Sequence, residues 1–212
     1  MSETLKREPS TLATRLRAET RALHQEVEAT PVISRLLRGE LGRAAYSALL
    51  RNLHEIYAAL EAGLLANAGH PQIARLFTPK LLRTAGLERD LEALQGPGWP
   101  ALPIAPAARS YGEHVKTLSA LRPELLAAHL YVRYLGDLSG GQMLEAIVAK
   151  SLGPGLAAFY DFGGREEAKH LARELRAGFG ALDGEGELAS AIVAEAREAF
   201  EAHRTLFSWL EQ

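Results

Sequence analysis

The residues best suited to do chemistry lie at 131–142, where Tyr-Val-Arg-Tyr-Leu-Gly-Asp-Leu-Ser-Gly-Gly-Gln places three glycines between flanks that both predict helix. Each glycine weakens a helix by about 1 kcal/mol relative to alanine, so the three need a compensating contact. Gly136 and Gly140 are four residues apart and leave a flat strip of bare backbone on one helical face. This strip could admit a broad planar ligand. It could also be a close contact with another helix, which the spacing alone favours.

Arg133 and Asp137 are also four residues apart and can form an ion pair on the same helix. On a protein surface such a pair stabilises by only about 0.3–0.5 kcal/mol. If the pair faces a cavity instead, Asp137 could hold ordered water beside a ligand and help to deliver protons.

His24 lies just off the apolar stripe of the first expected helix, and Arg17, Arg21 and Glu28 share its flank. A lone histidine at such a position is usually a satisfied boundary residue. The two arginines favour another interpretation, because a haem needs an imidazole for its iron, apolar surface for its macrocycle and cations for its propionates. The first helix offers all three.

Lys169 and Arg173 are one turn apart on a late helix and form a basic cluster. The simpler interpretation is a solvated face that pairs with acidic neighbours such as Glu166 and Glu174. The two cations would bind a ligand only if its carboxylates lay nearby.

Helices must position these residues, because Ala, Leu, Glu and Arg dominate the sequence and apolar residues recur at steps of three and four. No segment is typical of a strand, so we expect an all-α fold. Residues 71–106 should form short helical pieces and a Pro/Gly-rich surface connection at 96–103. The other helices are expected from near residue 10 to 27, and at 31–39, 43–66, 107–121, 123–152, 165–182 and 187–210.

The composition indicates a single domain over residues 1–212, with 1–9 as a disordered tail. The absence of cysteine excludes disulfides, thiolate nucleophiles and cysteine-ligated metals. A net charge of −2 argues against a nucleic-acid partner, and no apolar run is long enough for a membrane anchor. We therefore expect a soluble, cytoplasmic protein.

Several other classes of enzyme lack their sequence signatures here. The chain has no HExxH motif, Walker loop or nucleophile elbow, and residues 136–141 follow a helix rather than the strand of a dinucleotide-binding fold. Glu55 and Glu61 could face inward, but the paired Glu-x-x-His pattern of a di-iron bundle is missing.

The segment Arg-Tyr-Leu-Gly-Asp-Leu-Ser-Gly-Gly-Gln at 133–142 resembles the distal-helix signature of haem oxygenases of the mammalian and cyanobacterial type. Residues 16–24 are similar to the proximal helix of that family. The stretches at 54–61 and 169–173 also match in order and spacing, so the likeness covers nearly the whole chain. It implies a multi-helical fold with haem between a proximal helix and a kinked, glycine-rich distal helix.

The resemblance implies roles on the proximal side. His24 would be the axial ligand of the haem iron, and Glu28 would help to orient its ring. The propionates would meet the basic residues Arg17, Arg21, Lys169 and Arg173. Tyr131 would make another polar contact at the haem edge.

On the distal side, the resemblance places Gly136, Ser139 and Gly140 against the haem face. The residues that would organise distal water are Asp137, Arg133 and Tyr57. Phe200 and His203, on the last helix, would line or back the pocket.

The activity that the resemblance implies is oxidative cleavage of haem b, which is both substrate and cofactor, to biliverdin, carbon monoxide and ferrous iron, with cleavage at the α-meso carbon. Dioxygen is the co-substrate, and the electrons would come from a separate reductase or a ferredoxin or flavodoxin system. A phytochrome-type protein is a possible acceptor of the bilin.

Two alternatives stay open at this point. A haem-binding or haem-transfer protein could use His24 and the basic residues without catalysis. A helical enzyme that acts on a small heterocycle such as thiamine is less favoured, because the chain has no cysteine nucleophile.

The sequence departs from the family pattern at a few positions. Arg17 and Arg21 stand where lysines are common, which keeps the charge but changes the geometry available to a propionate. Val132 replaces a residue that is often polar. These changes leave the haem affinity unpredicted. They do not affect the expected axial ligand or the distal carboxylate.

Overall fold

The computed structural model describes residues 11–211, so the tail expected at 1–9 lies outside the described residues. Within this range the chain is helical and forms no strand. One isolated bridge pairs Thr11 with Asp183. The α-helices are α1 (Leu12–Glu28), α2 (Pro31–Leu37), α3 (Arg43–Ala66), α4 (Thr84–Gln95), α5 (Pro106–Leu121), α6 (Leu126–His129), α7 (Leu135–Leu152), α8 (Arg165–Gly180) and α9 (Gly186–Trp209).

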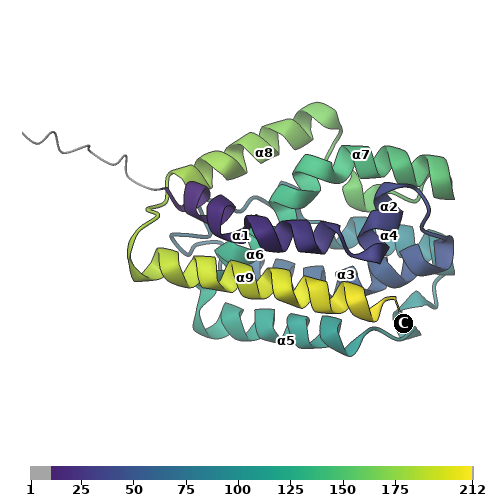
Figure 1. Ribbon diagram of the computed structural model, residues 1–212, viewed down its shortest axis with the longest axis horizontal. Helices are drawn as coiled ribbons and strands as arrows, with labels where there is room; N and C mark the ends of the chain where they lie inside the picture. Colours follow the sequence, from purple (N-terminus) through teal and green to yellow (C-terminus); the bar gives the residue numbers. More distant parts are fainter. Residues whose placement is uncertain (1–10, 212) are drawn as a thin grey trace, which may run out of the picture.

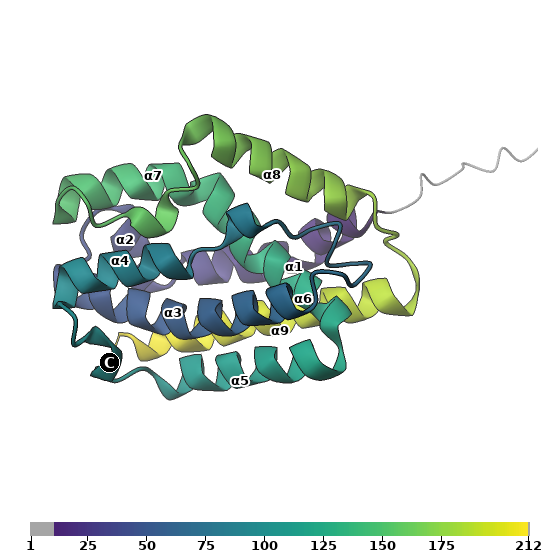
Figure 2. The same ribbon diagram turned by 180° about the vertical axis from the view of Figure 1, so that it is seen from behind.

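Helix α3 forms the centre of the fold. Figures 1 and 2 show α5 along one side of it, α4 on another, and α1 beside α9 across the opposite face. The side of α3 that was expected to be buried is buried, from Tyr46 through Leu53 and Ile56 to Leu64. The buried side of α3 packs against the surrounding helices. Its residues therefore belong to one continuous hydrophobic core of the described chain.

Most helix boundaries agree with the expectations from the sequence. α1 begins at Leu12 after Thr11, whose side chain accepts a hydrogen bond from the Thr14 backbone N–H as an N-cap. α2 begins at Pro31, and Gly39 follows its end with a φ of 69°. The pattern of apolar and capping residues thus fixes these helices locally.

The helical stretch expected over 123–152 is divided into several pieces. The short turn η3 (Pro123–Leu125) leads into α6, and the π-helical segment η4 (Leu130–Tyr134) joins α6 to α7. A π turn holds an extra residue, so it shifts the register of the side chains that follow, and such turns are frequent at functional sites. Figure 2 shows that the chain changes direction between α6 and the far end of α7, as expected for a kinked helix.

The loop after α7 is held in place by α4. The Asp90 carboxylate accepts hydrogen bonds of 2.9 Å from the backbone N–H groups of Ala158 and Phe159, which lie in the short turn η5 (Ala158–Tyr160). A Cβ on Gly86 would lie 2.6 Å from the Ala158 carbonyl oxygen, so only glycine allows this close approach. These contacts bring two aromatic side chains of η5 to the cavity described below.

Within residues 11–211, no helix is both long enough and apolar enough to cross a lipid bilayer.

Candidate haem site

A cavity opens between α1, α2, α3, α7, α9 and the loop at η5. It encloses about 760 Å³, including its mouth toward solvent. Its walls are mainly apolar, with a few polar side chains, as is usual for a site that binds an organic ligand. Of the expected site residues, the cavity is lined by His24, Glu28, Arg133, Gly136, Asp137, Phe200 and His203.

The glycines of α7 differ in their surroundings. A methyl group on Gly136 or Gly140 would meet no neighbouring atom of the described chain within 4 Å, whereas one on Gly141 would contact the carbonyl oxygen of Tyr160 at 3.5 Å. The helix contact that the spacing favours is therefore wrong for Gly136 and Gly140. Gly141 faces a neighbouring segment, and Gly136 presents bare backbone to the cavity.

Asp137, Arg133 and Tyr57 form one buried network. The Arg133 guanidinium donates from Nη2 to Oδ1 of Asp137 at 3.2 Å and from Nε to the Tyr57 hydroxyl at 3.0 Å. The Tyr57 hydroxyl in turn donates to Oδ2 of Asp137. The ion pair is thus not a surface pair. It lines the cavity, and the expected grouping of these residues is present in the structure.

Burial changes the acid–base properties of this network. It raises the pKa of the Asp137 carboxyl above its ordinary value, although the Arg133 charge and the Tyr57 hydrogen bond oppose the shift. Burial alone would lower the pKa of Arg133, but the charge of Asp137 and the contact with Tyr57 hold it above its ordinary value. The cavity wall therefore carries a fixed cation beside a carboxyl group that protonates more readily than an exposed aspartate.

A second layer of residues, whose role the sequence did not reveal, supports Tyr57. The rings of Tyr134 and Phe159 pack edge-on against the Tyr57 ring, at centroid distances of 5.5 and 5.3 Å. The Tyr134 hydroxyl donates to Oε1 of Glu61 at 3.1 Å, while Oε2 accepts from the Thr84 hydroxyl at 2.6 Å at the start of α4. Glu61 is thus a buried anchor between two helices, not a ligand of a di-iron site.

His24 lies at the mouth of the cavity, on the α1 side. Its side chain is 50% exposed, and Nδ1 is 3.5 Å from Oε2 of Glu28. Its ring packs edge-on against Phe200, at a centroid distance of 5.8 Å. These contacts fit a satisfied boundary residue, and they also fit an axial ligand, because a metal-binding imidazole is commonly held beside a carboxylate.

His203 is the buried histidine of this cavity. Nδ1 is 2.7 Å from the Ala199 carbonyl oxygen, and Nε2 is buried without a hydrogen-bond partner among residues 11–211. Burial, and next the charge of Arg133, hold the pKa of His203 well below its ordinary value. His203 thus belongs to the cavity wall as a neutral imidazole with one unpaired, buried nitrogen.

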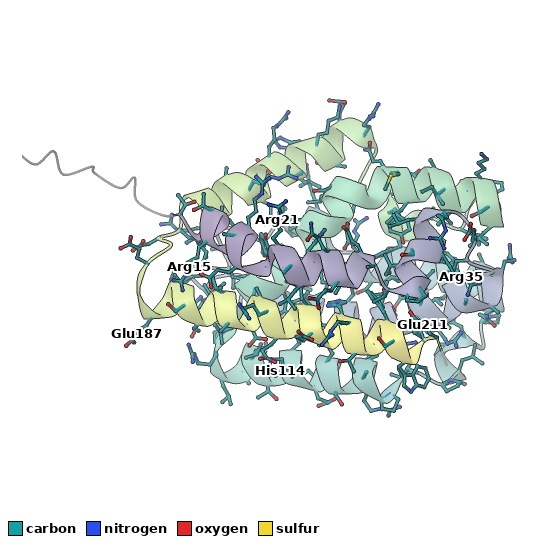
Figure 3. All side chains as sticks on the ribbon, in the orientation of Figure 1. Arg15, Arg21, Arg35, His114, Glu187 and Glu211 are labelled. Carbon is teal, nitrogen blue, oxygen red and sulfur yellow. The ribbon has the colours of Figure 1, made fainter. Side chains whose placement is uncertain are left out.

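The expected propionate-binding residues lie outside the cavity lining, on exposed parts of two neighbouring helices, α1 and α8. They are Arg17, Arg21, Lys169 and Arg173. Figure 3 shows Arg21 on the side of α1 where α8 lies. The Lys169 ammonium donates to Glu166 at 2.8 Å, so this part of the solvated-face interpretation is correct.

Two further residues that were expected at the haem, Ser139 and Tyr131, lie at the junction of α7, η4 and α8. Ser139 accepts a hydrogen bond of 2.8 Å from Arg176, a residue for which no role was expected. The Tyr131 ring packs edge-on against Phe179 at 5.7 Å and is partly buried. Both side chains connect the glycine-rich segment to α8, beside the basic residues.

Other side chains of the cavity wall were not expected to belong to the site. Phe159 and Tyr160 come from the loop after α7, and the remaining apolar lining comes from α1, α2, α3, η4, α7 and α9. Leu49 and Leu53 were expected to be buried, but nothing in their periodicity showed that they border a cavity. The flat backbone strip, the apolar lining, the accessible imidazole and the exposed cations together fit a haem.

Comparisons with known proteins agree with the interpretation of this cavity as a haem site. The family model described as Heme oxygenase matches residues 10–209. Heme oxygenase 1 of Synechocystis sp. is 35% identical over 203 residues, which cover 94% of this chain and 85% of that protein.

Solved structures extend the similarity to the fold. The crystal structure of heme oxygenase-1 from Synechocystis sp. in complex with heme has a TM-score of 0.88 at 34% identity, and the match covers 95% of this chain and 93% of that one. Heme oxygenase from Leptospira interrogans has a TM-score of 0.87 at 30% identity, with 94% and 100% covered. The chain therefore belongs to the haem oxygenase family.

Proposed function

We propose that this chain binds haem between α1 and α7, with His24 as the axial ligand, and cleaves it oxidatively to biliverdin, carbon monoxide and ferrous iron. The observation that carries the proposal is the cavity wall of α7, where bare backbone at Gly136 adjoins the buried Asp137–Arg133–Tyr57 network. Relatives across nearly the whole chain are named heme oxygenases, which supports it.

Haem, when bound, supplies the iron that binds dioxygen and the meso carbon that is oxidised. The chain supplies the proton chemistry. Asp137 lines the cavity and is fixed by Arg133 and Tyr57, so it can hold a water molecule at a defined position and transfer protons through it. Because burial raises the pKa of Asp137, this carboxyl group takes up a proton more readily than an exposed aspartate does.

The remaining residues bind and orient the haem. Glu28 holds the His24 ring, and Gly136 with Gly140 lets the distal helix approach the macrocycle. Arg17, Arg21, Lys169 and Arg173 bind the propionates, with Tyr131 and Ser139 near the same edge. Phe200 and His203 close the cavity from α9.

The reaction needs electrons, and no flavin- or nicotinamide-binding motif is present in the sequence. We therefore propose an external reductase, or a ferredoxin or flavodoxin system, as the electron donor. From the family resemblance we also propose cleavage at the α-meso carbon. A phytochrome-type protein as acceptor of the bilin is a further part of the proposal.

The test is a turnover assay on the purified chain with haem, air and either ascorbate or a reductase. We expect the Soret band to disappear and a bilin to form, and chromatography of the product identifies the α isomer. Haem that keeps its Soret band without bilin formation would contradict the proposal and would instead support a haem-binding or haem-transfer protein.

A further inference from the structure

A cluster of two histidines and a carboxylate lies outside the haem cavity, where α5, α6 and α9 meet. Nε2 of His114 is 2.7 Å from Oε1 of Glu195, and Nε2 of His129 is 3.1 Å from the same oxygen. One ligand atom from each of the three residues lies within 4.8 Å of the others. Figure 3 shows His114 between α5 and α9.

From this cluster we propose a binding site for a divalent first-row transition metal ion such as Zn²⁺, with His114, His129 and Glu195 as its ligands. Two imidazoles and a carboxylate are the donors that such ions accept in sites with three protein ligands and an open position. A tetrahedral ion with ligands at about 2.0–2.1 Å would separate the donor atoms by roughly 3.3 Å. The two observed N–O distances need to lengthen by less than about 1 Å, and the ligand atoms of the two histidines lie within 4.8 Å of each other.

A hydrogen bond behind the cluster supports this assignment. The Tyr111 hydroxyl is 2.9 Å from Nδ1 of His129, so it fixes the ring with Nε2 toward Glu195. Metal-bound histidines nearly always have such a partner on their second nitrogen. Because the hydroxyl can donate or accept, it suits either tautomer of the imidazole.

The burial of the three side chains suits a site with a rigid wall and an open side. His129 is completely buried and Glu195 is 9% exposed, whereas the His114 side chain is 48% exposed. Two ligands are thus held by packing, and the third can adjust its position. The open side at His114 would let the ion enter and leave room for a water ligand.

A purely structural role is the competing interpretation. In that case Glu195 only accepts hydrogen bonds from two imidazoles, and removal of exposed His114 changes no metal affinity. The two interpretations therefore differ in a direct measurement of binding.

The experiment is calorimetric titration of the full-length chain, chelator-treated and without haem, with Zn²⁺ as the probe. We expect one tight equivalent in the wild type. The affinity should fall at least 10-fold in His114→Ala, whose melting temperature without metal should stay near that of the wild type because the side chain is half exposed. Tyr111→Phe, which keeps the ring, should weaken binding about 10- to 100-fold.

Two variants serve as matched controls. His170 forms an exposed pair with Glu174 at 3.3 Å on a single helix, so His170→Ala should keep the tight equivalent. His24→Ala should keep it as well, which separates this site from the proposed axial ligand. Equal affinity of the wild type and His114→Ala, or loss of the tight equivalent in either control, would overturn the proposal.

Discussion

The α7 wall and the α1 wall of the haem cavity are held in different ways. On the α7 wall, Asp137 is buried, and the Arg133 side chain, which comes from η4 just before α7, is 14% exposed. Each of the two forms hydrogen bonds to the other and to Tyr57. On α1, the His24 side chain is 50% exposed and lies 3.5 Å from Glu28. The protein thus fixes the side chains of the α7 wall much more tightly than those of the α1 wall.

This difference matches what each wall must do. Proton transfer depends on the position of the donor to within a fraction of an ångström, so the carboxylate needs a preorganised network. An axial ligand needs an accessible nitrogen lone pair, which an exposed imidazole offers. We infer that the α7 wall controls what happens to the haem, whereas the α1 wall controls whether it is ligated.

The largest expected effect is on the α1 wall. His24→Ala should abolish normal axial ligation and reduce bilin formation below detection, because no other imidazole among the described residues lies at the cavity mouth. The ferric haem spectrum measures ligation, and added imidazole should restore part of it. An unchanged spectrum in this variant would show that His24 is not the axial ligand.

The α7 network should respond through stability as well as activity. Tyr57→Phe removes the hydroxyl that accepts from Arg133 and donates to Asp137, which leaves a buried guanidinium nitrogen unpaired. Urea unfolding should show a loss of about 1–3 kcal/mol in the free energy of unfolding. A loss below about 0.5 kcal/mol would mean that the network is less tightly held than the structure indicates.

The glycine strip can be tested by a variant that gains stability while it loses function. Gly136→Ala adds a methyl group that meets no neighbouring protein atom, so unfolding should become harder by up to about 1 kcal/mol. The same methyl group faces the cavity and should weaken haem binding, which absorbance titration measures.

Gly86→Ala is the matched control, because its methyl group would clash with the Ala158 carbonyl oxygen at 2.6 Å. It should destabilise the fold instead. If both variants lower stability equally, then Gly136 packs against protein after all.

The smallest expected effect is a loss of stability at acidic pH that depends on His203. Its folded-state pKa lies well below the value of about 6.5 in the unfolded chain, so the unfolded state takes up a proton that the folded state refuses. The contribution of neutral His203 to the free energy of unfolding is therefore fully present above about pH 6.5. It is lost as the pH falls below this value, by up to about 1.4 kcal/mol per pH unit.

Without haem, His203→Leu should remove this part of the acid sensitivity. When the pH is lowered from 7 to 5.5, the free energy of unfolding measured with urea should fall by about 1 kcal/mol less in His203→Leu than in the wild type. His170→Leu, at an exposed position, should follow the wild type. Identical pH profiles for the wild type and His203→Leu would contradict the neutral, buried state of His203.

Local patterns predicted most of the helices correctly. The bounds of α3 match the expected 43–66, because its periodicity is strong and Gly42 precedes it as N-cap. The π turn at η4 was not predictable, because helical propensity does not distinguish an α turn from a π turn.

The site was predictable where its chemistry is local in sequence. The Arg133–Asp137 pair follows from spacing alone, and the resemblance added Tyr57 to it. The glycine spacing gave the wrong preference, because open space beside Gly136 depends on helices far away in the chain. Phe159 and the anchoring role of Glu61 were not predicted for the same reason, because their contacts join segments that no local pattern relates.

We infer that Asp137 directs the oxidation of a haem that His24 ligates. The most direct test compares the wild type with Asp137→Ala in two measurements, the ferric haem spectrum and the bilin yield per haem, with Asp137→Asn as a control that keeps the size of the side chain. We predict that Asp137→Ala binds haem with His24 ligation intact, while its bilin yield falls at least about 100-fold and peroxidase-type oxidation of added phenols rises. A wild-type bilin yield from Asp137→Ala would show that Asp137 does not direct the oxidation.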